Sequence, residues 1–245
     1  MSKRSKALRY YRSYKPQSAL RKLFLYLLRL IVVVFLLYQI VSIFFIQVYT
    51  RNNQNGETER YIASPLIYGP ELPLFNYRFP AFRSPGRGDL AAAAYNPDRS
   101  SSWYTMILNS FSRFFTFNRL SIFDDRNPYY GSRYQLFRVI GVPGDTVKLE
   151  NFRVKIKSSD SNYFIDEFEA IQDEYVIQVP EQGDFVSAEL PFSGNQPEMV
   201  LKKGEYLLVP DNRTGLAASV HWKSTEFSRI KARVMLSFWP GFSLL

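Results

Sequence analysis

The longest feature of the hydrophobic pattern is an apolar run near the N-terminus. Residues 23–49 are apolar with few exceptions, and residues 30–46 contain no charge, glycine or proline. A helix of about 20 apolar residues crosses a bilayer core and satisfies its own backbone hydrogen bonds there. The run is longer than the apolar region of a cleaved signal peptide, about 7–15 residues, and core helices are seldom apolar on every face. The pattern therefore predicts a transmembrane signal anchor over residues 23–49.

Beyond residue 60, short apolar or alternating runs replace the long one. Six prolines fall between residues 62 and 98, which predicts extended segments and turns there rather than helix. Later runs with the character of strands are separated by turn signals such as Pro143-Gly144-Asp145. These runs are residues 136–141, 146–149, 153–156, 175–179, 205–209 and 232–238. Short strands with Gly and Pro turns predict a mainly β domain of antiparallel sheet.

One stretch departs from the strand pattern. Residues 103–117 place Trp103, Ile107, Phe111 and Phe115 near helical spacing, which predicts an amphipathic helix inserted between two strands. Two interpretations of its aromatic face stay open at this point. Either the helix packs on the sheet, or its aromatic surface lies in the membrane interface.

Charge is concentrated at the N-terminus. The chain carries 31 Lys and Arg against 22 Asp and Glu, a net charge of +9, and residues 1–29 hold nine basic side chains and no acidic one. The positive-inside rule predicts a cytoplasmic N-terminus and an exported domain, and the basic tail is expected to contact anionic membrane lipid. Because the remainder is neutral, we expect no nucleic-acid partner. The expected parts are a basic cytoplasmic tail at 1–22, the anchor at 23–49, a linker at 50–60 and an exported β domain at 61–245.

The rare residue types exclude several kinds of site. The chain has no cysteine and one histidine, His221, so disulfides, cysteine-based zinc sites and three-histidine zinc sites are excluded. No phosphate-binding loop occurs, and the G-x-G at residues 86–88 lacks the third glycine of a dinucleotide fingerprint. We therefore expect neither a metal nor a cofactor.

Three separated segments carry motifs. They are G-R-G-D-L at residues 86–90, F-R-V-I-G-V-P-G-D-T-V at residues 137–147 and G-E-Y-L-L-V-P-D-N-R at residues 204–213. In this order, behind an N-terminal anchor, they resemble the bacterial type I signal peptidases, whose segments read R-G-D-[IV]-V-V-F, K-R-[VI]-[IV]-G-[LV]-P-G-D-x-[VI] and G-D-N-R-D-N-S-x-D-S-R. The resemblance covers about residues 23–245, with an insertion near residues 99–133. The matching residues are Arg87, Gly88, Asp89, Arg138, Gly141, Pro143, Gly144, Asp145, Asp211, Asn212 and Arg213.

The resemblance implies a β domain of signal-peptidase type at the outer, periplasmic or extracytoplasmic, face of the bacterial cytoplasmic membrane. The family's chemistry uses a serine hydroxyl that attacks the scissile carbonyl and a buried, neutral lysine that takes its proton. The lysine position falls on Phe137, and the serine position, in S-M-x-P-T-L, falls on Ile67. Ser64 is a weak candidate nucleophile, because it lies three residues too early for the proline of that motif.

The groups that support the dyad in the family are also replaced. The resemblance places Leu216, Ala218 and Val220 where the family has a serine and an Asp–Arg pair. Arg138, next to the lysine position, cannot serve as the base because guanidinium stays protonated. The sequence therefore indicates a scaffold that has kept its structural motifs and lost its catalytic ones.

Other titratable residues are interpreted as structural. We expect His221, Lys148 and Lys155 to lie on the surface, and we do not expect any of them to replace the catalytic base. Turn residues that bond their own backbone are expected at Asp89, Asp145 and Asp211.

Three functions stay open on this sequence. The first is a catalytically inactive, membrane-anchored signal-peptidase-like protein that binds extended segments of exported pre-proteins, or that regulates an active signal peptidase. The second is a divergent active signal peptidase that uses Ser64 and an unrecognised base. The third is an envelope structural or assembly protein that no longer binds peptide.

Overall fold

The computed structural model describes residues 19–52, 58–72, 77–94, 103–116, 134–171, 175–179, 194–213 and 222–244. The chain divides into two compact units, residues 1–40 and 41–245. The first contains most of the N-terminal helix, and the second contains the β domain.

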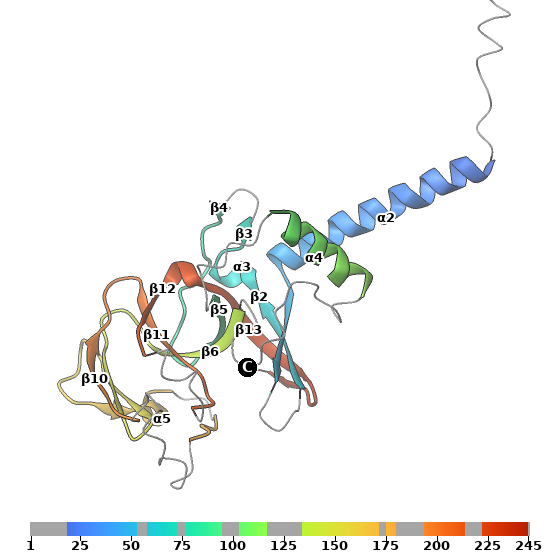
Figure 1. Ribbon diagram of the computed structural model, residues 1–245. Helices are drawn as coiled ribbons and strands as arrows, with labels where there is room; N and C mark the ends of the chain where they lie inside the picture. The colour runs from blue at the N-terminus through green and yellow to red at the C-terminus, as the bar shows by residue number, and fades with distance from the viewer. Residues whose placement is uncertain are drawn as a thin grey trace, which may run out of the picture. The chain divides into compact units, whose positions relative to one another are not determined.

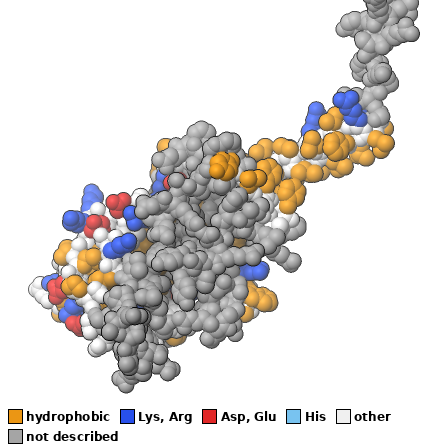
Figure 2. All heavy atoms as spheres, viewed as in Figure 1, with side chains coloured by type: hydrophobic (Ala, Val, Ile, Leu, Met, Phe, Trp, Pro, Cys, Tyr) orange, Lys and Arg blue, Asp and Glu red, His pale blue; other side chains and the backbone are white. Residues whose placement is uncertain are grey.

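Helix α2 (Ala19–Phe44) coincides with most of the apolar run. Its 26 residues give a length of about 39 Å at 1.5 Å per residue, against ~30 Å for a bilayer core. None of its residues is buried, and Figure 2 shows hydrophobic side chains along it with basic side chains near its N-terminal end. By length and composition, α2 is a candidate membrane span.

The helix ends before the end of the predicted anchor. Residues 47–49 lie in β1 (Gln47–Asn52), which pairs antiparallel with β2 (Thr58–Ser64). Tyr49 packs against the apolar cluster that contains Tyr61, so strand pairing and packing, rather than hydropathy, decide the structure there. The described residues of the predicted linker at 50–60 belong to these two strands.

The β domain consists of one large sheet, a second sheet and a short two-stranded one, all paired antiparallel (Figure 1). The large sheet has the order β1-β2-β13-β5-β6-β11-β12, with β14 paired to β13. Its strands beyond the first hairpin are β5 (Leu90–Ala94), β6 (Tyr134–Gly141), β11 (Glu205–Val209), β12 (Ser224–Glu226), β13 (Ile230–Trp239) and β14 (Ser243–Leu244). The predicted mainly β, antiparallel fold is confirmed.

The second sheet has the order β10-β7-β8-β9. It is formed by β7 (Thr146–Glu150), β8 (Arg153–Lys157), β9 (Ile165–Asp166) and β10 (Gln196–Val200). The two-stranded sheet pairs β3 (Glu71–Leu72) with β4 (Tyr77–Arg78). The strands are connected in part by two short helices, α3 (Pro65–Tyr68) and α5 (Glu167–Ala170), and by the 3-10 turn η2 (Phe227–Arg229). In Figure 1, β10 and α5 lie at one end of the domain, apart from β2 and α3.

Strands β6 and β11 contribute alternate residues to two apolar clusters, because successive strand side chains point to opposite faces. Ile140 and Leu207 belong to a cluster with the second sheet. Phe137 and Leu208 belong to the other cluster, which we call the site cluster. The buried members of the site cluster are Tyr68, Ala91, Ala93, Phe137, Val139, Tyr206, Leu208 and Ile230.

Most predicted elements are present. Helix α4 (Trp103–Phe115) confirms the inserted helix predicted at 103–117. The strands predicted at 136–141, 146–149, 153–156, 205–209 and 232–238 lie within β6, β7, β8, β11 and β13.

Two local predictions are wrong. Residues 175–179 do not form a strand; Gln178 makes an isolated bridge to Asn212, and its backbone bonds reach Asp211 and Arg213. The proline-containing region at 62–98 holds the helix α3 as well as extended segments, and Pro65 stands at its first turn. Proline is tolerated there because the first N–H groups of a helix have no intrahelical acceptor.

Candidate functional site

The structure brings Ile67 and Phe137, the two positions that the resemblance assigns to the dyad, into one apolar environment. Ile67 lies on α3 and is half-buried, and it packs against the site cluster to which Phe137 belongs. Phe137 lies on β6 and is 3% exposed. Neither side chain can donate, accept or transfer a proton, so this pair has no part in nucleophilic chemistry.

Local backbone contacts hold Ile67 in place. Its carbonyl oxygen accepts hydrogen bonds from the backbone N–H groups of Phe82 and Arg83, each at 3.1 Å. Helix α3 then ends at Gly69, where φ is +89° and an added Cβ would lie 2.3 Å from the carbonyl oxygen of Phe79. Only glycine fits this close approach.

Ser64 lies where β2 meets α3. It is the N-terminal cap position of α3, but its side chain makes no capping hydrogen bond. Its backbone pairs with Arg233 of β13, whose guanidinium stays protonated and cannot act as a base. Within the described part of the chain, no lysine or histidine is hydrogen-bonded to the Ser64 hydroxyl.

A small cavity borders Phe137. Its volume is about 20 Å³, close to the space that one water molecule requires. It is lined by Ala93, Ala94, Phe137, Leu208, Lys223, Thr225 and Arg229. Lys223 is a residue that the sequence gave no reason to single out, because only the pairing of β6, β11 and β12 brings it near Phe137. The Lys223 side chain is exposed, so it lacks the burial that a neutral catalytic lysine requires.

The first motif anchors α3 to the sheet through Asp89. The Asp89 carboxylate is buried and accepts hydrogen bonds from the Tyr68 hydroxyl at 2.9 Å and from the Gly86 N–H at 2.7 Å. Arg233 Nε lies 2.9 Å from the same carboxylate. Burial, together with the negative charge of Asp89, raises the pKa of Tyr68. This network fixes Tyr68, the residue next to Ile67.

The second motif forms a tight turn around Asp145. Its carboxylate accepts the Val142 N–H at 2.9 Å and an Arg87 guanidinium N–H at 2.7 Å. Gly141 has no room for a side chain, because an added Cβ would lie 2.6 Å from Leu201 Cδ1. Gly144, exposed like Pro143 beside it, has a φ of +95°, a region that favours glycine. The motif residues therefore position β6 and β7.

The second and third motifs meet in an ion pair. Arg138 Nε and Nη2 donate to the two carboxylate oxygens of Asp211 at 2.9 and 3.0 Å, and Nη1 donates to the Gly88 carbonyl at 3.0 Å. Its guanidinium also lies over the Tyr175 ring at 4.2 Å. Asp89 and Asp145 do bond nearby backbone N–H groups as expected, but Asp211 binds Arg138 instead.

A fully buried pair lies next to this network. Arg213 Nη1 and Nη2 donate to the two oxygens of Glu167 at 2.7 and 2.8 Å, and both side chains are almost completely shielded from water. Tyr175 donates to Glu167 at 2.9 Å. Burial and the carboxylate of Glu167 raise the pKa of Tyr175. Arg213 of the third motif is thus joined to α5 by this pair.

The remaining residues considered as replacement bases or support groups lie partly within and partly outside the described residues. Lys148 pairs with Glu150 at 2.7 Å and Lys155 pairs with Asp166 at 2.9 Å, which fits the structural interpretation of both lysines. Burial alone would raise the pKa of Asp166, but the hydrogen bonds from Lys155 and from a backbone N–H outweigh it and lower the pKa. Four predicted positions lie outside the described residues, namely Leu216, Ala218, Val220 and His221.

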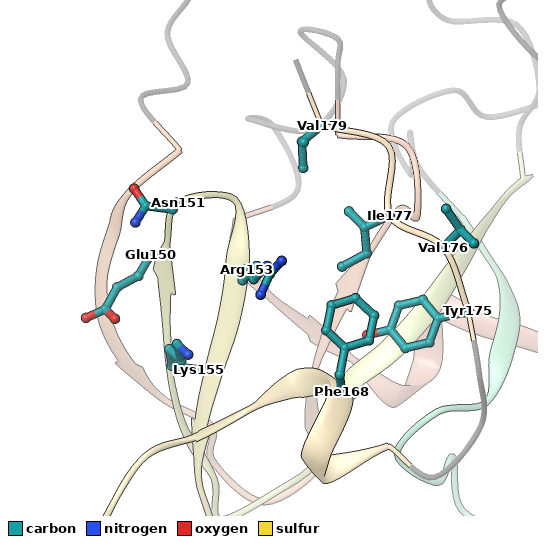
Figure 3. Close-up of a pocket in the computed structure, with 9 residues that line it drawn as sticks. All are labelled: Glu150, Asn151, Arg153, Lys155, Phe168, Tyr175, Val176, Ile177 and Val179. Atoms are coloured by element: carbon teal, nitrogen blue, oxygen red, sulfur yellow. The ribbon is translucent and has the colours of Figure 1, made fainter. Parts of the chain in front are cut away.

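A second concave surface lies on the second sheet (Figure 3). The cleft has a volume of about 750 Å³ and combines charged, aromatic and aliphatic side chains. Its lining residues are Glu150, Asn151, Arg153, Lys155, Phe168, Tyr175, Val176, Ile177 and Val179. The rings of Phe168 and Tyr175 lie 5.1 Å apart, and Figure 3 shows Ile177 pointing toward them. Within the described ranges, no group of three His, Cys, Asp or Glu side chains could hold a metal ion.

A candidate span followed by an antiparallel β domain with three interlocked motifs defines a protein of signal-peptidase type. Comparison with known proteins agrees: the family described as "Signal peptidase, peptidase S26" matches residues 24–239. The chain therefore belongs to the signal peptidase family S26, as the motifs predicted.

Curated relatives support the same family. The chain is 32% identical over 105 residues to signal peptidase IB of Staphylococcus aureus strain Mu50, a match that covers 42% of this chain and 52% of the relative. The same protein of strains N315 and MW2 matches equally well. The chain thus spans about half the length of the curated relatives it matches.

Proposed function

We propose that this protein is a membrane-anchored member of the signal peptidase family that has lost Ser/Lys catalysis and binds extended segments of exported pre-proteins. The observation that carries the proposal is the pair Ile67 and Phe137, which fill the dyad-equivalent positions with one continuous apolar contact region. The β domain would act on the outer side of the membrane.

The missing groups account for the loss of chemistry. A serine enzyme depends on an activated nucleophile and its base acting as a unit, and removing one member costs roughly a million-fold in kcat. Here both aligned positions are hydrocarbon. Ser64 has neither the family spacing nor a hydrogen-bonded base among the described residues, and Lys223 is exposed.

Peptide binding needs less chemistry than cleavage. An extended peptide can add to the edge of a sheet through main-chain hydrogen bonds, with shallow pockets selecting its side chains. Strand β12 ends the large sheet among the described strands, and its Thr225 lines the cavity beside Phe137. The volume of about 20 Å³ suits a methyl-sized group, which supports peptides with small side chains.

The proposal is tested by measuring binding of a fluorescent signal peptide to the full-length protein in detergent, by anisotropy. We expect wild-type protein to bind a peptide with alanine at its small positions and Thr225→Trp to bind it much more weakly. Ser224→Trp is the matched control, since neighbouring strand residues point to opposite faces. Absence of binding by wild-type protein would favour an envelope structural or assembly role instead. Equal loss in both variants would contradict a site at the Phe137 cavity.

A further inference from the structure

Helix α4 presents an apolar stripe to the surroundings. Tyr104, Leu108, Phe111 and Phe115 are between 41% and 62% exposed. Their spacing of four, three and four residues places all of them on one side of a helix with 3.6 residues per turn. Arg113 lies on the opposite side by the same count, so the helix is amphipathic with its apolar side outward.

Aromatic contacts shape this stripe. The rings of Phe111 and Phe115 stack with their centroids 6.4 Å apart and an interplanar angle of 11°. Phe114 meets Phe115 edge to face at 5.1 Å. The stripe is therefore a continuous exposed surface, of the kind that marks an interaction site rather than isolated exposed residues.

The lipid surface is the partner that the chain itself supplies. The candidate span α2 ends at Phe44, and strand β1 begins at Gln47, so two residues separate the β domain from the helix. If α2 is in the membrane, the domain is held within about 7 Å of extended chain from its end. The bilayer interface is then always close to α4, because the anchor holds the domain beside it. A soluble partner would first have to diffuse to the helix and bind.

Charge supports the same partner. Helix α4 itself contains one basic residue, Arg113, and no acidic one. An amphipathic helix with aromatic residues on one side and a basic residue on the other is suited to the interface of an anionic membrane. Tyrosine rings favour the same depth, because one end is apolar and the other polar.

We propose that α4 is a second membrane contact, which lies in the lipid interface with Tyr104, Leu108, Phe111 and Phe115 inserted. It uses residues of the insertion rather than the motif segments, and it is independent of whether the protein binds or cleaves peptides. Together with α2, it would restrict the rotation of the β domain over the membrane surface.

The absence of cysteine in the chain allows a direct test with single-cysteine variants. Leu108→Cys of the full-length protein is labelled with bimane and reconstituted into vesicles of phosphatidylcholine and phosphatidylglycerol. Ser110→Cys, on another side of α4, is the matched control. A phosphatidylcholine with a nitroxide near the top of its acyl chain then quenches whatever label lies in the interface.

We expect loss of most bimane emission at position 108 and little loss at position 110. The quenching at 108 should weaken when phosphatidylglycerol is omitted. Equal quenching at the two positions would contradict the proposal. So would an unquenched label at 108. A disulfide between two copies of the unlabelled Leu108→Cys protein would then show that a second copy covers the stripe.

Discussion

Phe137 occupies its position on β6 among Tyr68, Val139 and Leu208 of the site cluster and is 3% exposed. A buried lysine side chain is mostly a hydrocarbon stem, so an aromatic ring can fill similar space without its charge. The strand therefore keeps its packing when the amine is lost. Phenylalanine at the position that the resemblance assigns to the lysine is therefore compatible with the fold.

Restoring the amine should reveal the apolar character of the site. We expect Phe137→Lys to destabilise the folded protein by about 3 kcal/mol at pH 7, because burial lowers the pKa of the new amine and penalises its charged form. The unfolded chain binds the proton more readily, so this destabilisation should shrink as the pH rises toward the usual lysine value of about 10.4. Urea unfolding at pH 7 and pH 9.5 measures it.

Phe137→Met is the matched control for that variant. Methionine is unbranched like lysine but carries no charge, so its cost should not depend on pH. A destabilisation by Phe137→Lys that equals the methionine cost at both pH values would contradict an apolar, water-excluding site cluster.

At the element scale, helix α5 is tied to the third motif by Glu167. Glu167 accepts two hydrogen bonds from Arg213, one from the Tyr175 hydroxyl and one from the Val154 N–H of β8. Each of these donors comes from a different part of the chain. The contribution of α5 to stability is therefore concentrated in one buried carboxylate.

We expect Glu167→Ala to cost about 3–5 kcal/mol of unfolding free energy, because it leaves the Arg213 charge buried without its partner. Glu169→Ala, on the exposed side of the same helix, should change stability by less than about 0.5 kcal/mol. Chemical denaturation followed by tryptophan fluorescence compares the two. Similar small effects from both substitutions would show that the buried pair does not hold the second sheet.

The sequence was informative where local pattern decides structure. Strands β6, β7 and β8 show a clear alternation of apolar and polar residues, and α4 shows helical spacing. These local patterns predicted all four elements. Residues 175–179 have an apolar, strand-like composition, but their hydrogen bonds go to Asp211 and Arg213 rather than to a strand, a tertiary contact that no local pattern contains. The same limit applies to Lys223, which reaches the neighbourhood of Phe137 only through the order of the strands.

At the scale of the whole molecule, the charge asymmetry around the candidate span predicts one orientation. With the basic tail inside, Thr50→Cys should react with an impermeant thiol reagent on intact cells, and Ser5→Cys should not. The wild-type chain, which has no cysteine, provides an unlabelled background. Labelling of residue 5 but not of residue 50 would reverse the topology and remove the exported domain from this account.

Cleavage of a signal-peptide substrate by the purified full-length protein in detergent decides whether Ser/Lys catalysis has been lost. We expect no cleavage by wild-type protein and no change in Ser64→Ala. The double variant Ile67→Ser with Phe137→Lys should show weak cleavage at most, because the resemblance also assigns apolar residues, Leu216, Ala218 and Val220, to the support positions. Cleavage by wild-type protein that disappears in Ser64→Ala would contradict the account and establish an active peptidase.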